Sequence, residues 1–154
     1  MNIEKQRILC MDYGDVRCGF AVSDPTGLLA SGIGTVKISG LRFLIEHIKK
    51  MADEYGITLI VVGNPVNLNG TRGPKSAAAE ELAGRIESET GIKTELFDER
   101  LSTMAAHRVM NETGTFGKKR KNTVDTLSAQ IILQDYMDRH RNERSGEDGG
   151  AAAF

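Results

Sequence analysis

The chain has 154 residues, of which 40% are hydrophobic and 27% are charged, and its formal net charge is −1. This length suits one domain with a substantial core, and the balanced composition is that of a globular protein rather than of a disordered chain. The sequence has no run of about 18 apolar residues, so we expect no transmembrane helix. Residues 1–6 lack the apolar run of a signal peptide, so we expect a cytoplasmic protein that does not enter the membrane.

The cysteines and histidines do not suggest a zinc site. Cys10 and Cys18 lie in or beside predicted strands, and the three histidines are scattered along the chain. In a cytoplasmic protein two cysteines are expected to remain thiols. Because the net charge is close to zero, any binding of nucleic acid would depend on local basic patches rather than on the overall field.

The first forty residues predict three antiparallel strands connected in a meander. Their apolar and β-branched runs are separated by turns rich in glycine and aspartate. The turn that starts at Asp24 has proline at its second position, where proline fits best. The predicted strands cover residues 7–11, 18–23 and 28–38.

After the meander, helical and strand patterns alternate. Ser39 can cap a helix that ends at Gly56, and the continuous β-branched run that follows is typical of a strand buried on both faces. We therefore predict an α/β fold in which a mixed five-stranded sheet has helices on both faces. It forms one domain over residues 1–141, and the Gly-rich residues 142–154 form a disordered tail. The predicted elements are helix 41–55, strand 57–62, helix 74–90, strand 92–97, a helix from Ser102 or Thr103 to about 112, and a helix from Asn122 or Thr123 to about 141.

Acidic side chains fall where an α/β sheet binds its ligands. Ligands lie outside the carboxyl ends of parallel strands, and Asp12 ends the first predicted strand while Asp98 and Glu99 end the last. Asp125 falls in the apolar stripe of its helix, where a charge needs a partner or a metal. Carboxylates that converge either share a proton or bind a divalent cation, and oxygen ligands favour Mg²⁺ or Mn²⁺. We predict a metal site there, and two ions about 4 Å apart could stabilise both the attacking and the leaving oxygen of a phosphodiester.

Each of these acids also has a purely structural interpretation. Asp12 can be a turn former, and Asp125 can stabilise the N-terminus of its helix. The segment from Asp98 to Arg100 can be a solvated loop with an internal ion pair. Since side chains alternate along a strand, Asp98 and Glu99 cannot both face the site if the strand is regular, and the longer reach of Glu99 favours it.

Basic residues near the acids predict contacts with a polyanion. Arg17 lies between two glycines of the first hairpin, where its guanidinium can bind a phosphate or pair with Asp15 or Asp24. A basic run precedes the helix of Asp125, and its place beside an acidic metal site favours contact with a nucleic-acid backbone. The predicted nucleic-acid contacts are Arg17, Arg100, Lys118, Lys119, Arg120 and Lys121.

Four motifs in order resemble the YqgF/RuvX family, small bacterial proteins with a ribonuclease H-like fold. The opening pattern Asp-x-Gly-x-x-Arg-x-Gly-x-Ala-x-Ser-Asp matches residues 12–24. The later motifs are VVGNPVNLNGTRG, DERLST and KRKNTVDTLSAQIILQDY, so the resemblance covers about residues 7–136. Two positions depart from the pattern: Asp15 replaces a neutral or basic residue, and Asn64 replaces an apolar one.

The resemblance implies a metal-dependent nuclease. Asp12, Glu99 and Asp125 would be catalytic and, with Asp98 as the alternative to Glu99, would hold Mg²⁺ or Mn²⁺. Members of the family are associated with processing the 5′ end of precursor 16S ribosomal RNA, and a likeness to the RuvC resolvase also suggested cleavage of Holliday junctions. We expect an endonuclease of ribosome biogenesis, monomeric or homodimeric, that acts on structured RNA in ribosomal precursor particles.

Three other functions are compatible with the same motifs. The protein could resolve branched DNA in recombination and repair, or it could bind nucleic acid without cleaving it. A strand that ends in Asp-x-Gly before a hairpin also begins actin-like ATPases, but those proteins need a second lobe to enclose the nucleotide, and one domain of this length does not provide it.

Overall fold

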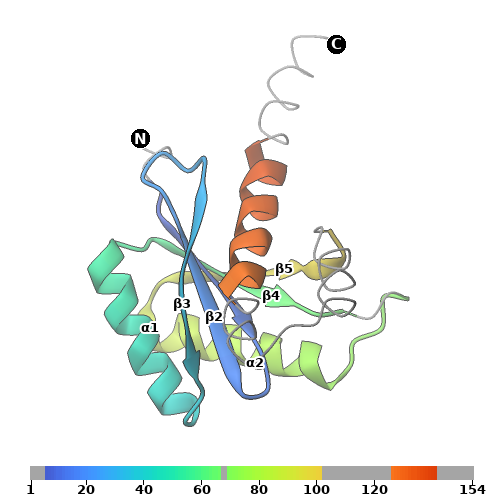
Figure 1. Ribbon diagram of the computed structural model, residues 1–154. Coiled ribbons are helices and arrows are strands. Elements are labelled where there is room, and N and C mark those ends of the chain that lie inside the picture. The colour runs from blue at the N-terminus through green and yellow to red at the C-terminus, as the bar shows by residue number, and fades with distance from the viewer. Residues whose placement is uncertain (1–5, 67–68, 102–125, 142–154) are drawn as a thin grey trace, which may run out of the picture.

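The computed structural model describes residues 6–66, 69–101 and 126–141, which form a mixed sheet with helices on both faces (Figure 1). The first three strands are antiparallel, and the last two run parallel to the first. The predicted meander and the mixed five-stranded sheet are therefore confirmed. In the spatial order β3-β2-β1-β4-β5, the strands are β1 (Ile8–Tyr13), β2 (Arg17–Ser23), β3 (Ala30–Lys37), β4 (Leu59–Asn64) and β5 (Lys93–Asp98).

Two hydrophobic cores lie on the two faces of the sheet. Helices α1 (Leu41–Tyr55) and α2 (Pro74–Thr90) cover one face, and helix 126–141 covers the other (Figure 1). Alternate residues of β1 serve the two cores: Leu9 and Met11 pack under α1 and α2, whereas Ile8 and Cys10 pack under helix 126–141. The same alternation directs Asp12 to the face of helix 126–141.

Every predicted strand shifts by one or more residues at an end, and three local differences from the prediction have a clear cause. Ser39 does not cap α1, because the N-cap is Gly40 with a φ of 101° and no side chain caps the helix; only glycine adopts such a φ readily. The third strand begins at Ala30 rather than at residue 28, because the Asp24 carboxylate binds the N–H groups of Leu28 and Leu29 in the turn. The fourth begins at Leu59 rather than at residue 57, since the N–H of Ile57 bonds back to the end of α1.

Some predicted features lie outside the described residues. These are the helix predicted to end at about 112, the basic run 118–121, the first residues of the last helix and the tail 142–154. Within the described ranges, no helix is long and apolar enough to cross a membrane. Cys10 and Cys18 are buried thiols on opposite faces of the sheet, which confirms their predicted reduced state.

Candidate functional site

Asp12 has glycine neighbours on both adjacent strands. Its partner on β2 is Gly19, and the parallel register that pairs Cys10 with Val61 and Met11 with Val62 brings Gly63 of β4 beside it. Neither glycine adds a side chain on the face of helix 126–141. On this face, therefore, neither adjacent strand places a side chain directly beside Asp12.

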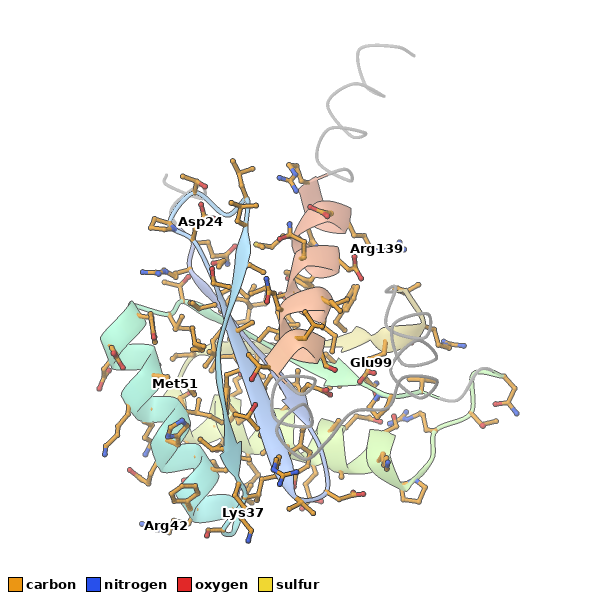
Figure 2. All side chains as sticks on the ribbon, viewed as in Figure 1. Asp24, Lys37, Arg42, Met51, Glu99 and Arg139 are labelled. Carbon is orange, nitrogen blue, oxygen red and sulfur yellow. The ribbon has the colours of Figure 1, made fainter. Side chains whose placement is uncertain are left out.

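Glu99 occupies the space above Gly63. Figure 2 shows Glu99 near the end of β5. β5 ends at Asp98, and Glu99 begins the short 3₁₀ helix η2 (Glu99–Leu101). The residue is buried, with 7% of its surface exposed. A Cβ atom added to Gly63 would lie 3.1 Å from Glu99 Oε2 and 3.0 Å from Ile132 Cδ1. The carboxylate thus lies where a side chain at position 63 would lie, on the face that Asp12 shares.

The Cys10 thiol is affected by both carboxylates. Burial raises the pKa of Cys10 well above its ordinary value, and the negative charges of Asp12 and Glu99 raise it further. Both acids therefore lie near one buried sulfur atom, although they are far apart in the sequence. Because the thiol keeps its proton at neutral pH, the site offers carboxylate oxygens rather than a thiolate.

Asp98 binds Arg100 instead of joining this pair of acids. The guanidinium Nε donates to both carboxylate oxygens at 3.1 and 3.0 Å, and Nη2 donates to Oδ2 at 2.6 Å. These hydrogen bonds lower the pKa of Asp98 below its ordinary value. The internal ion pair considered for this loop is present, but it engages Asp98 and leaves Glu99 beside Gly63. Between the two acids, the geometry favours Glu99 as a ligand.

Arg17 lies on the same face as Asp12. It begins β2, two residues before Gly19, and strand alternation directs both residues to one side of the sheet. In the described part of the chain Arg17 forms an ion pair with neither Asp15 nor Asp24, the two partners that the sequence offered. Asp15 lies 3.9 Å from Lys75 Nζ, and Asp24 holds the turn that follows β2.

Two contacts between polar side chains position the edges of this site. Ser76, buried in the first turn of α2, donates a hydrogen bond to Asn64 Oδ1 at 2.7 Å and so links the end of β4 to that helix. The hydroxyl oxygens of Thr35 and Thr126 lie 2.6 Å apart, which places the described start of helix 126–141 over β3. Asn64 is one of the two departures from the family pattern, and Ser76 is the partner it binds.

Part of the predicted site lies outside the described residues, namely Asp125 and the basic run of Lys118, Lys119, Arg120 and Lys121. Over residues 6–66, 69–101 and 126–141, no three His, Cys, Asp or Glu side chains form a group that could hold a metal ion. The described ligand candidates are thus the two carboxylates of Asp12 and Glu99. The sequence patterns did not predict the role of Gly63. The one indication of it in the sequence is that a glycine directly follows the buried apolar run of β4.

The sequence matches the family model described as "RuvX: Holliday junction resolvase" over residues 6–139. The chain belongs to this family. A relative from Ruminiclostridium cellulolyticum, named "Putative pre-16S rRNA nuclease", is 44% identical over 134 residues, which is 86% of this chain and 94% of the relative. A relative of the same name from Geobacillus kaustophilus is 42% identical over 137 residues, which is 88% of this chain and 99% of the relative. The predicted YqgF/RuvX resemblance is confirmed.

The fold of this RuvX-family chain is also found in solved structures. "T. thermophilus RuvC in complex with Holliday junction substrate" aligns with a TM-score of 0.56 at 12% identity, covering 88% of this chain and 96% of that chain. A second RuvC structure, "Thermus thermophilus RuvC structure", aligns with a TM-score of 0.51 at 12% identity, covering 88% of this chain and 97% of that chain. Similarity at this identity shows a shared fold, and it confirms the predicted ribonuclease H-like architecture.

Proposed function

We propose that this protein is a metal-dependent endonuclease that processes the 5′ end of precursor 16S ribosomal RNA. The observation that carries the proposal is the convergence of Asp12 and Glu99 on one face of the sheet, where Gly63 lies beside Asp12 and under the Glu99 carboxylate. The substrate is supported by relatives that match this chain over nearly their whole length and are named "Putative pre-16S rRNA nuclease". The proposal places the protein in the cytoplasm, on ribosomal precursor particles, as a monomer or homodimer.

The donor set fits a hard divalent cation. Asp12 and Glu99 supply only carboxylate oxygens, and the neighbouring thiol stays protonated, so the ligands suit Mg²⁺ or Mn²⁺ rather than a thiophilic metal. Asp125 directly precedes Thr126 in the sequence and is the proposed third ligand. When bound, a divalent cation supplies Lewis-acid stabilisation of the charge that develops on the phosphoryl oxygens.

The chain's own residues would position the phosphodiester. Gly19 adds no side chain beside Asp12, and the absence of a side chain at Gly63 lets the Glu99 carboxylate lie on the same face. Arg17 lies on the same face, where its guanidinium can bind a phosphate through two parallel hydrogen bonds. Arg100, oriented by Asp98 at the end of β5, is proposed to contact the strand farther along this edge.

Cleavage assays test the proposal. A labelled 5′ fragment of precursor 16S rRNA and a four-way DNA junction are incubated with Mg²⁺, with Mn²⁺ or with EDTA. We expect metal-dependent cleavage of the RNA that is lost in Asp12→Asn and Glu99→Gln and retained in Asp98→Asn. Cleavage of the junction alone would assign the protein to DNA recombination instead. Binding of either substrate without any product would make it a binding module, and both of these results contradict the proposal.

A further inference from the structure

We propose that Arg17 and Lys37 together bind a backbone phosphate of the nucleic acid, next to the phosphate that lies at Asp12. The two residues are direct cross-strand partners on β2 and β3. The inference rests on the proposed function, because it assigns a substrate contact to the same site. It adds Lys37, which no sequence motif indicated, and it gives Arg17 a partner.

Arg17 and Lys37 form the closest kind of antiparallel pair. The N–H of Ile38 donates to the carbonyl oxygen of Val16 at 2.8 Å, and this bond flanks the pair on its outer side. It is the bonding pattern of a non-hydrogen-bonded pair, in which the Cα atoms are about 4.5 Å apart and the side chains are closest. The two cationic side chains therefore leave the sheet side by side.

Both side chains project from the face of the sheet that also carries Asp12. Along β2 and β3, Arg17 and Lys37 stand two residues away from the partners Gly19 and Thr35. Thr35 binds Thr126 of the helix that covers this face, and strand alternation directs residues two apart to the same side. Gly19 in turn is the cross-strand partner of Asp12.

Two cations in this arrangement are unfavourable for the free protein. Like charges directly opposite each other destabilise a strand pair. Lys37 is exposed and Arg17 is partly buried, and across the described ranges neither forms an ion pair. The acid in the same hairpin, Asp15, lies 3.9 Å from Lys75 instead. An anion held between Arg17 and Lys37 would remove their repulsion.

The spacing from Asp12 fits a polynucleotide. Two residues along β2 correspond to about 7 Å, and the phosphates of one strand follow each other every 3.4 Å or so along a duplex axis. A strand with one phosphate at Asp12 would therefore bring a phosphate one or two nucleotides away to the Arg17–Lys37 pair. Arginine supplies a planar fork and lysine a mobile point charge, which together suit a phosphodiester.

The salt dependence of binding tests this contact. Binding of labelled RNA and of DNA of the same sequence is measured in EDTA, so that no cleavage occurs. We expect Lys37→Gln and Arg17→Gln each to reduce the slope of log K against log salt by about 0.9 for a duplex and about 0.7 for a single strand. The loss of affinity relative to wild type should then be roughly three times larger at 50 mM than at 200 mM salt.

Two further variants control the test. Lys50 is exposed on α1, whose buried side packs against the opposite face of the sheet, so Lys50→Gln should keep the wild-type slope. Lys37→Glu would place an acid opposite Arg17, so it should raise the Tm of the free protein while weakening binding more than Lys37→Gln does. A wild-type slope in Lys37→Gln, or a lowered Tm in Lys37→Glu, would overturn the phosphate site.

Failure of this site and failure of the nuclease proposal give different results. If Asp12→Asn abolishes cleavage while Lys37→Gln binds as wild type, the nuclease stands and the phosphate site is wrong. If no substrate is cleaved but the slope falls in both Lys37→Gln and Arg17→Gln, the phosphate site stands and the nuclease proposal fails.

Discussion

Gly63→Ala is the smallest change that should disturb the position of Glu99. The added Cβ would lie 3.1 Å from Glu99 Oε2 and 3.0 Å from Ile132 Cδ1, closer than ordinary van der Waals contact, so both neighbours must move by a few tenths of an ångström. The backbone of Gly63 has no positive φ, and alanine can adopt it. The effect therefore comes from crowding on the face of helix 126–141 and not from backbone strain.

Crowding and chain entropy act in opposite directions on stability. An extra methyl group in a packed interior costs about 1–3 kcal/mol, whereas replacing glycine by alanine at a compatible site gains about 0.4–1 kcal/mol through the unfolded state. We expect Gly63→Ala to lower the free energy of unfolding by about 1 kcal/mol. Residues that orient a metal ligand affect metal affinity by about 10–100-fold when changed, and we expect a loss in this range for Mn²⁺.

Ile132→Val separates packing from ligand positioning. Valine lacks the Cδ1 atom, so the double variant Gly63→Ala/Ile132→Val should recover stability in urea unfolding while calorimetry still shows weakened Mn²⁺ binding. Ile132→Val alone is the matched control and should bind Mn²⁺ as wild type. Wild-type Mn²⁺ affinity in Gly63→Ala, or recovery of affinity together with stability in the double variant, would refute this role of Gly63.

Other predictions concern the acids and the link between β4 and α2. Glu99→Gln should reduce RNA cleavage at least about 100-fold and Asp98→Asn less than about tenfold, and equal losses would show that both acids act alike. Ser76→Ala should cost about 1 kcal/mol in urea unfolding because Asn64 Oδ1 loses its donor, and adding Asn64→Leu should recover most of it. Asp24→Ala should lower the Tm by a few degrees. Hydrogen bonds from Thr26 and from turn N–H groups lower the pKa of Asp24 to about 2, so this stabilisation is full above about pH 4 and is lost as the pH falls through about 2.

The sheet could be predicted because its strands carry strong local signals. The β-branched run before Gly63 requires burial on both faces, and the turn at Asp24 separates two antiparallel strands. The position of Asp12 near the end of β1 followed from the same pattern. Local periodicity is sufficient for these features, since each depends on residues close together in the sequence.

The finer features of the site depend on register and on strand ends, which local patterns do not specify. Alternation along the strand could not choose between Asp98 and Glu99, because β5 stops at Asp98 and the chain then turns into η2. The pairing of Arg17 with Lys37 arises from the β2–β3 register. The contact of Gly63 with Glu99 arises from parallel pairing between β4 and β5.

The most direct test of the proposed metal site at Asp12 and Glu99 is a Mn²⁺ titration that follows binding and RNA cleavage in the same samples. Wild-type protein should cleave the precursor 16S fragment in proportion to the metal bound. Asp12→Asn and Glu99→Gln should each lose both Mn²⁺ affinity and cleavage while keeping the wild-type fold by circular dichroism. Cleavage by either variant at the wild-type rate and metal requirement would contradict the site.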